Sequence, residues 1–152
     1  MKLKVIPPLV LLVFGGLMYL LYRFLPVGHF DFFGREQLAI FLCSLAVLIM
    51  LIALLQFIKV KTTTNPINLT KTNSLVTNGI FKYTRNPMYL AMLLILIAFG
   101  LKLGNAFNTL LAAGFVYYIN HFQIKREEKA LTDLFGKRYK VYCKETRRWF
   151  WH

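Results

Sequence analysis

Four long apolar segments constrain what this chain can fold into. A bilayer core of about 30 Å is crossed by about 20 apolar residues in a helix. Backbone groups find no water inside lipid, so such segments form helices rather than open strands. The chain is 57% hydrophobic, which is more apolar than a soluble domain of 152 residues. The segments are residues 5–25, 38–58, 88–103 and 107–124.

This pattern predicts an all-α, polytopic membrane protein with about four transmembrane helices and a cytoplasmic C-terminal helical segment. We expect a single integral-membrane domain over residues 1–152, with a two-helix N-terminal part (1–58) and a core (59–152). The first apolar run is too long for a signal peptide and no small-residue cleavage site follows it, so we expect a membrane anchor.

The basic residues are unevenly placed around these segments, and the formal net charge is +13. They gather before the first segment, between the second and third, and after the fourth, whereas Arg23, Arg35 and Lys102 lie near the other side. By the positive-inside rule, both termini and the long middle loop are cytoplasmic. No soluble domain presents this charge to nucleic acid, so bilayer lipid is the expected partner. The short chain and the lack of organelle signals favour a bacterial inner membrane.

Residues 79–90 form a basic, polar stretch that runs directly into the third apolar segment. Asn78-Gly79 is a turn signal. Asn86 is a residue type favoured at helix N-caps, and Pro87 is favoured at the first helical position. We therefore expect a helix that begins at Pro87 with free N–H groups and a positive dipole end, which suits an anion. The polar loop before it, residues 61–82, is long enough to be functional.

A tight connection at Gly104-Asn105 separates the third segment from the fourth. We expect the two to form an antiparallel helical pair, which brings Pro87 and Glu127 to the same side of the membrane. The fourth helix should continue through residues 125–135 and end at Gly136.

Helical periodicity places Tyr117, His121 and Glu128 on one face of that extended helix. Trp149 lies beside two arginines in a stretch typical of an interfacial aromatic belt.

Three pieces of the sequence together resemble the isoprenylcysteine carboxyl methyltransferase family, part of a wider group that includes phospholipid N-methyltransferases. They are Gly79 followed by Tyr-Thr-Arg-Asn-Pro-Met-Tyr at 83–89, the Glu127-Glu128 pair, and a Phe-Gly-x-x-Tyr-x-x-Tyr tail at 135–142. The resemblance covers residues 65–149. It implies S-adenosylmethionine as the methyl donor, S-adenosylhomocysteine as the product, a donor site at the cytoplasmic edge, and a lipophilic acceptor that enters from the bilayer.

The charges of S-adenosylmethionine match the polar residues of these pieces. Arg85 and the helix start at Asn86-Pro87 can hold its carboxylate. Glu127 or Glu128 can pair with its ammonium or accept from its ribose hydroxyls. The family often has His where this chain has Asn86, so a contact made by that His is not transferred to this chain.

Aromatic and titratable residues complete the expected site. Tyr89, Tyr117 and His121 should line the pocket, where aromatic faces suit a sulfonium. The candidate catalytic residues are Arg85, Glu128 and His121. No cluster with metal-ligand spacing is present, and we expect no metal.

Several functions fit parts of this pattern. A carboxylate acceptor, as in isoprenylcysteine O-methylation, needs no strong base, whereas a phospholipid amine must lose a proton, for which His121 or a Glu is a candidate. A small transporter would need an acid within the membrane to couple protons, and the predicted segments hold none. A non-catalytic scaffold explains the basic tail but not the paired carboxylates. Methyl transfer to a lipophilic carboxylate is therefore the favoured expectation.

Overall fold

A computed structural model describes residues 6–25, 27–59 and 74–150, and these residues are helical apart from short connections. No strand occurs among the described residues, so the all-α prediction is confirmed for them. In chain order the elements are α1 (Pro7–Phe24), α2 (Arg35–Lys59), η2 (Gly79–Lys82), α3 (Pro87–Leu103), α4 (Asn108–Tyr118), η3 (Ile119–Ile124), α5 (Lys125–Phe135) and α6 (Lys137–Glu145). Residues 61–73 of the predicted functional loop lie outside the described part.

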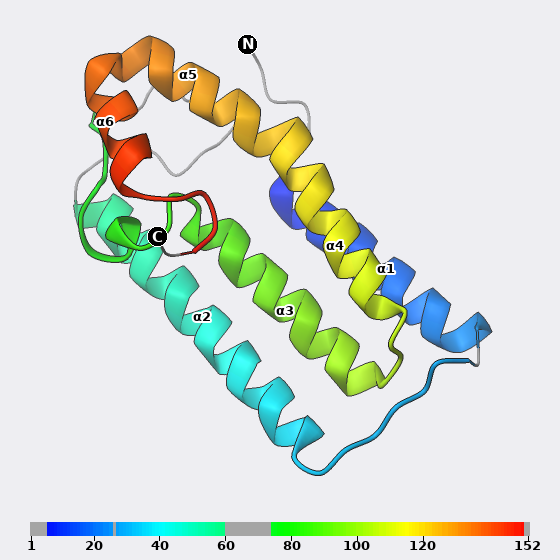
Figure 1. Cartoon of the computed structure of the whole chain (residues 1–152). Helices are drawn as coiled ribbons and strands as arrows, with labels where there is room; N and C mark the ends of the chain where they lie inside the picture. Colours follow the sequence, from blue (N-terminus) through cyan, green and yellow to red (C-terminus); the bar gives the residue numbers. More distant parts are fainter. Residues whose placement is uncertain (1–5, 26, 60–73, 151–152) are drawn as a thin grey trace.

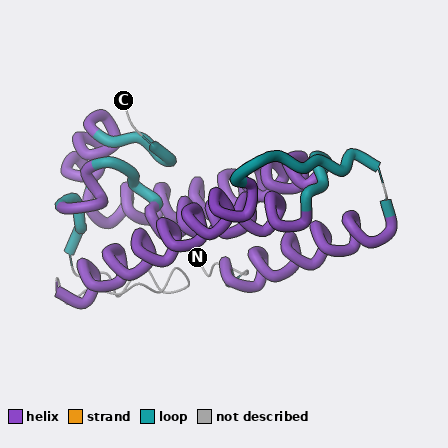
Figure 2. Tube along the Cα trace, turned by 90° about the horizontal axis from the view of Figure 1, so that it is seen from below, coloured by secondary structure: helices purple, strands orange, loops and turns teal. Residues whose placement is uncertain are grey.

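The helices run side by side, with α3 between α2 and α4 (Figure 1). α1 packs against both α3 and α4. α3 and α4 are antiparallel, as predicted, and α4 continues through the π-helical turns of η3 into α5. The connecting loops gather at the two ends of this helical layer (Figure 2). The start of α3 and the start of α5 therefore lie at the same end of the molecule.

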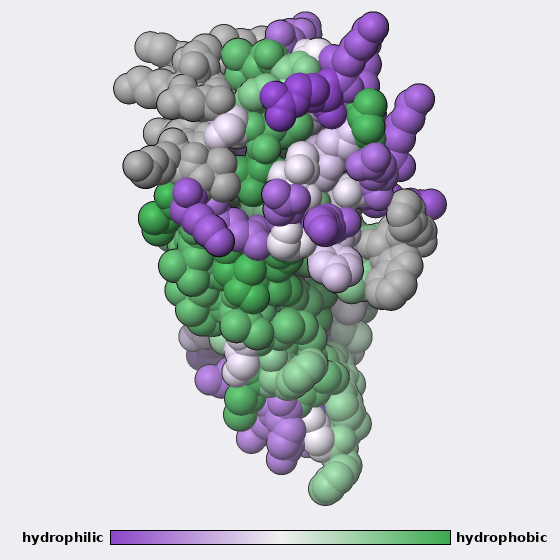
Figure 3. All heavy atoms as spheres, turned by 90° about the vertical axis from the view of Figure 1, so that its left-hand side faces the viewer, coloured by the Kyte–Doolittle hydropathy of each residue, from purple (hydrophilic) through white to green (hydrophobic). Residues whose placement is uncertain are grey.

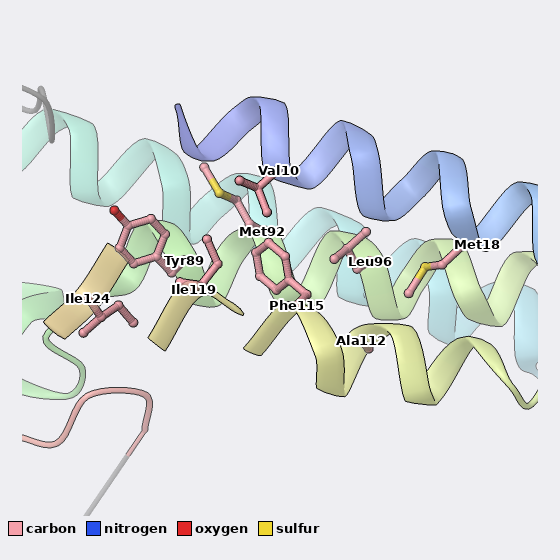
Figure 4. Packing of buried hydrophobic residues seen from close by; sticks show 9 residues of the cluster. All are labelled: Val10, Met18, Tyr89, Met92, Leu96, Ala112, Phe115, Ile119 and Ile124. Atoms are coloured by element: carbon pink, nitrogen blue, oxygen red, sulfur yellow. The ribbon is translucent and has the colours of Figure 1, made fainter. Parts of the chain in front are cut away.

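Side chains from α1, α3 and α4 form the largest buried cluster. Phe115 is fully buried at its centre, and Phe14 meets it edge-on with ring centroids 5.7 Å apart. The cluster extends from Met18 at one end to Tyr89 and Ile124 at the other (Figure 4). It packs the first two turns of α3 against η3. This packing fixes the relative position of the helix ends at which the polar residues gather.

α2 approaches α3 through small residues. Its buried residues are Ala39, Ala46 and Ala53, which recur every seven positions and so share one face. Small side chains let helix backbones come close, which is how helices associate in lipid, where no hydrophobic force drives them together. Large apolar side chains point outward instead, and Leu12 and Ile40 are 70% and 66% exposed. Figure 3 shows a broad apolar region with polar residues above and below it.

Two of the described helices are long and apolar enough to cross a membrane: α1 with 18 residues and α2 with 25. They match the predicted first and second segments closely. α3 is apolar but has 17 residues, about 25 Å of helix at 1.5 Å per residue, which is shorter than the bilayer core. α4 is shorter still, although it is continuous with η3 and α5. The structure thus supports a membrane-inserted helical protein, while the four-span arrangement stays a prediction.

The connection between α3 and α4 is held by the loop that follows α1. Gly104 ends α3 in the left-handed region (φ 64°), and its carbonyl accepts from the Phe30 amide at 2.9 Å. Asn105 is buried, donates to the Leu25 and Val27 carbonyls, and accepts from the Phe107 amide at 3.0 Å. The tight connection predicted at Gly104-Asn105 is confirmed.

Replacing Gly104 with Ala should lower the thermal stability of the purified protein by several degrees. A Cβ there would lie 2.0 Å from an Arg35 nitrogen, and the positive φ costs an L-residue about 1–2 kcal/mol. The matched control is Gly16→Ala within α1, where a Cβ meets nothing within 4 Å. Thermal unfolding in detergent measures both, and equal melting temperatures for the two variants would contradict the expectation.

Candidate functional site

The polar residues of the site are built around the start of α3. The helix begins at Pro87, as predicted, and Asn86 occupies the N-cap position. The predicted N-cap position of Asn86 is confirmed, but its side chain makes no capping hydrogen bond, and its Nδ2 donates to the Arg148 carbonyl at 3.0 Å. The Asn86 amide donates to the Thr84 hydroxyl at 3.1 Å. Asn86 therefore anchors the C-terminal end of the chain and leaves the first turn of α3 without a side-chain cap.

Glu128 lies between two guanidinium groups. An Arg85 terminal nitrogen is 3.0 Å from Glu128 Oε1. Arg148 reaches the same carboxylate through two nitrogens, with Nε at 2.8 Å from Oε1 and a terminal nitrogen at 2.6 Å from Oε2. The hydrogen bonds that Arg148 donates to Glu128 raise the pKa of Arg148 above its ordinary value. The pairing of Arg85 and Glu128 at one end of the helical layer agrees with the predicted proximity of the two segments.

Arg85 retains an unused donor. Its side chain is 11% exposed, and its Nε is buried without a hydrogen-bond partner among the described residues. A buried guanidinium N–H without an acceptor is costly, and a carboxylate is the acceptor that its planar fork matches best. The geometry therefore fits a carboxylate-bearing ligand beside Arg85.

Glu127 forms a second, separate pair with Tyr89 one turn inside α3. The Tyr89 hydroxyl donates to Glu127 Oε1, and Gln123 Nε2 donates to the same oxygen at 2.9 Å. Burial raises the pKa of Glu127 to about 7, because the hydrogen bonds from Tyr89 and Gln123 lower it by less than burial raises it. Glu127 thus has a pKa near neutral pH, whereas the Glu128 side chain is paired with two arginines.

Residues 146–149, which we call the C-terminal strap, cross over the start of α3 (Figure 1). The Arg85 amide donates to the Arg147 carbonyl at 2.9 Å, and the buried Thr84 hydroxyl donates to the Arg148 carbonyl at 3.1 Å. The Thr146 hydroxyl donates to the Lys82 carbonyl at 3.2 Å. The strap thus places Arg148 in the site, which the sequence analysis did not foresee.

Trp149 also belongs to this strap and makes contacts within the protein, while its interfacial role stays a prediction. Its indole Nε1 donates to Asn120 Oδ1 at 3.1 Å, and its ring packs against the main buried cluster. The sequence signal that could have found this contact is the isolated Asn120 inside an apolar helix, because such an amide needs a partner.

α6 supports the loop that precedes α3. The Tyr142 hydroxyl donates to the buried Phe81 carbonyl at 2.7 Å, and Tyr139 packs beside it in a second buried cluster. Burial raises the pKa of both phenols above the ordinary tyrosine value, so both stay neutral donors. The Phe-Gly-x-x-Tyr-x-x-Tyr tail therefore holds η2, and with it Arg85, in place.

Replacing Tyr142 with Phe should destabilise the protein by about 1–2 kcal/mol, because the Phe81 carbonyl loses its buried donor. The exposed Tyr83, also near the start of α3, provides the matched control as Tyr83→Phe. Melting temperatures in detergent compare the two variants. A Tyr142→Phe protein as stable as Tyr83→Phe would show that the hydroxyl does not hold this loop.

Tyr117 and His121 do not join the cluster. Tyr117 is 69% exposed, His121 is exposed, and their rings stack on one another with centroids 6.0 Å apart. The expected common face with Glu128 is wrong because residues 119–124 form a π-helix, which takes more residues per turn than an α-helix. The phase of α5 is therefore shifted relative to α4, which turns Glu128 toward Arg85 and leaves Tyr117 and His121 outside.

Comparisons with known proteins agree with this arrangement. The phospholipid methyltransferase family matches residues 34–138, more than half of the chain. A Haemophilus influenzae (strain ATCC 51907 / DSM 11121 / KW20 / Rd) protein described as uncharacterized is 48% identical over 62 residues, which are 41% of this chain and 98% of the relative. No solved structure matches the chain.

The matched region contains α2 through α5, and so includes Arg85, Tyr89 and both carboxylates. The chain belongs to the phospholipid methyltransferase family. The resemblance drawn from the sequence is confirmed for this wider group. The family and the two long apolar helices together indicate a methyltransferase integrated in a membrane.

Proposed function

We propose that the protein transfers the methyl group of S-adenosylmethionine to a lipophilic acceptor at the cytoplasmic edge of a bacterial inner membrane. In this proposal the four apolar segments cross the bilayer and both termini are cytoplasmic. The observation that carries the proposal is the convergence of Arg85, Tyr89, Glu127, Glu128 and Arg148 from three separated parts of the chain.

The cluster suits the zwitterionic end of the donor. Arg85 offers its buried Nε to the donor carboxylate, and the uncapped first turn of α3 adds the positive end of a helix dipole. Glu128 can exchange one of its two arginines for the donor ammonium, which keeps the charge of the site balanced. Arg148 is 38% exposed and is therefore the partner that moves more easily.

S-adenosylmethionine supplies an electrophilic methyl group on a sulfonium, which leaves as a neutral thioether when a nucleophile attacks the methyl carbon. The chain contributes position, because alignment of two reactants removes much of the barrier. Tyr89 lies next to the charged cluster and at the end of the main buried cluster. In the proposed topology an acceptor from the bilayer would meet the donor there.

The Glu127–Tyr89 pair favours an amine over a carboxylate as the acceptor. An amine carries a proton at neutral pH, must lose it to attack, and is a cation of the same charge once it is methylated. Glu127, with a pKa of about 7, can accept that proton as a carboxylate, and after it releases the proton to water its carboxylate can pair with the product cation. A carboxylate acceptor, including that of a prenylated cysteine, makes no use of such a base. We therefore place a phospholipid-type amine ahead of the carboxylate favoured by the sequence pattern.

Calorimetry of the detergent-solubilised protein with S-adenosylhomocysteine tests the donor site. Radiolabelled methyl transfer into a lipid extract, followed by separation into amine-headed and acidic lipids, tests the acceptor. Label in the amine fraction supports the proposal, and label in the acidic fraction supports carboxyl methylation. If the well-folded protein binds neither donor nor product, the methyltransferase proposal is contradicted. A proton-linked flux in liposomes would then favour a transporter function.

A further inference from the structure

A groove lies between α3 and α4, in the half of the helical pair that is remote from the charged cluster. Its volume is about 350 Å³. Along most of its length the walls are apolar, with Leu93, Leu96, Ile97 and Leu101 on α3 and Ala113 and Val116 on α4. A cavity of this size is within the range of small-molecule sites, which are mainly apolar with a few placed polar groups.

One polar side chain in this groove has no partner. Asn108, the first residue of α4, is 2% exposed, and neither its Oδ1 nor its Nδ2 has a hydrogen-bond partner among the described residues. A buried carboxamide in this state costs free energy, and such groups are rare in folded proteins. Asn108 is one of the residues that line the groove.

The neighbouring polar groups are already engaged. Asn105 donates to two carbonyls and accepts from one amide, and the Thr109 hydroxyl donates to the Ala106 carbonyl at 2.6 Å. Neither therefore has a hydrogen left to donate to Asn108 Oδ1, and neither forms a hydrogen bond with the Asn108 carboxamide. Asn108 thus requires one donor and one acceptor from outside these contacts.

We propose that this groove binds a neutral single-chain lipid whose hydroxyl and carbonyl groups pair with the Asn108 carboxamide. The hydroxyl would donate to Oδ1 and the carbonyl would accept from Nδ2. A diacyl phospholipid ester offers carbonyl acceptors but no donor at that depth, so it would leave Oδ1 unpaired.

The rest of the groove sets the other properties of the ligand. Among the described residues no charged side chain lines it, so a charged head would be unpaired there. If a methylene group occupies about the 30 Å³ of a water molecule, the volume holds roughly a dozen of them, which is one chain rather than two. The chain would extend from Asn108 along α3 toward Leu93.

This site is separate from methyl transfer. Asn108 precedes Glu127 by 127 − 108 = 19 residues of nearly continuous helix, roughly 28 Å at 1.5 Å per residue. A head group at Asn108 is therefore at the opposite membrane face from the charged cluster and cannot be the reacting acceptor. The inference requires insertion in a membrane but not the proposed activity.

Native mass spectrometry of the detergent-solubilised protein, titrated with 1-monooleoylglycerol or methyl oleate, tests the proposal. Methyl oleate has the chain and the carbonyl but no hydroxyl donor. We expect one saturable site that prefers the monoacylglycerol by about tenfold, the value of one net hydrogen bond. Asn108→Leu should bind both lipids equally and weakly, since it removes both polar atoms.

A second pair of variants tests the groove without touching Asn108. Ala113 lines the groove and is exposed, so Ala113→Phe should block both lipids without disturbing the core. Leu110 is 67% exposed on the same helix and does not line the groove, so Leu110→Phe should bind as the unchanged protein does. Equal binding of the two lipids by the unchanged protein, or unaltered preference in Asn108→Leu, would overturn the proposal. The amount of S-adenosylhomocysteine bound should be the same in the unchanged protein and the three variants, whatever the lipid result.

Discussion

Replacement of Glu128 with Gln should weaken binding at the donor site. The dissociation constant for S-adenosylhomocysteine should rise by on the order of a hundredfold. The carboxylate is 17% exposed and balances Arg85 and Arg148. A neutral amide would leave two guanidinium groups facing each other and would give the donor ammonium no anion. Removal of one partner from a buried ion pair is strongly destabilising, so the melting temperature should also fall.

Glu145→Gln is the control for this result. Glu145 ends α6 near the C-terminal strap and is exposed, so the variant changes the net charge equally without touching the cluster. Calorimetry and thermal unfolding in detergent measure binding and stability separately. Binding of the product by Glu128→Gln at the unchanged affinity would remove the carboxylate from the donor site, even if the fold were weakened.

The second large effect is expected at Glu127. Glu127→Gln should lower the rate of methyl transfer to an amine by a factor of about 10²–10⁴, which is the usual contribution of a positioned base. The unchanged enzyme should become faster as the pH rises to about 7 and then level off, because only the deprotonated carboxyl accepts a proton. The variant should lack this rise. Initial rates from radiolabelled donor between pH 5.5 and pH 9, at about equal ionic strength, measure both profiles.

The same substitution has a readout that does not depend on activity. The pKa of Glu127 is raised from 4.5 to about 7 in the folded protein, so the folded state binds more protons than the unfolded state between these values. Stability should therefore fall as the pH rises through this window, relative to Glu127→Gln. If stability depends on pH in the same way in the two proteins, the pKa of Glu127 is not raised. The proposed role of Glu127 as a base would then be contradicted.

The long helices could be predicted from the sequence because apolar length and breaker residues act locally. Pro87 at the first helical position and Gly104 at the end set the bounds of α3 almost to the residue. The antiparallel pairing of α3 and α4 followed from the short connection between them. Arg85 and Glu128 could then be placed together by topology alone.

The missed details depend on contacts between distant segments. Local preference places Asn86 at the N-cap, but its side-chain amide donates to the carbonyl of Arg148, 62 residues away, rather than capping the helix. The π-helical turns at 119–124 carry no composition signal, and they displaced Tyr117 and His121 from the expected face. Arg148 resembled an ordinary basic residue of the tail until the C-terminal strap brought it to Glu128.

The residues of the site lie far apart in the sequence, so Arg85 has two successive electrostatic environments. During synthesis Arg85 leaves the ribosome before Glu128 and Arg148, so at that stage it is an uncompensated cation beside an emerging apolar helix. In the proposed topology, such a cation would hold its loop on the cytoplasmic side while the helix inserts. Its counter-ion arrives only after the turn at Gly104 has reversed the chain. In that topology one guanidinium would orient the nascent chain first and join the finished site later.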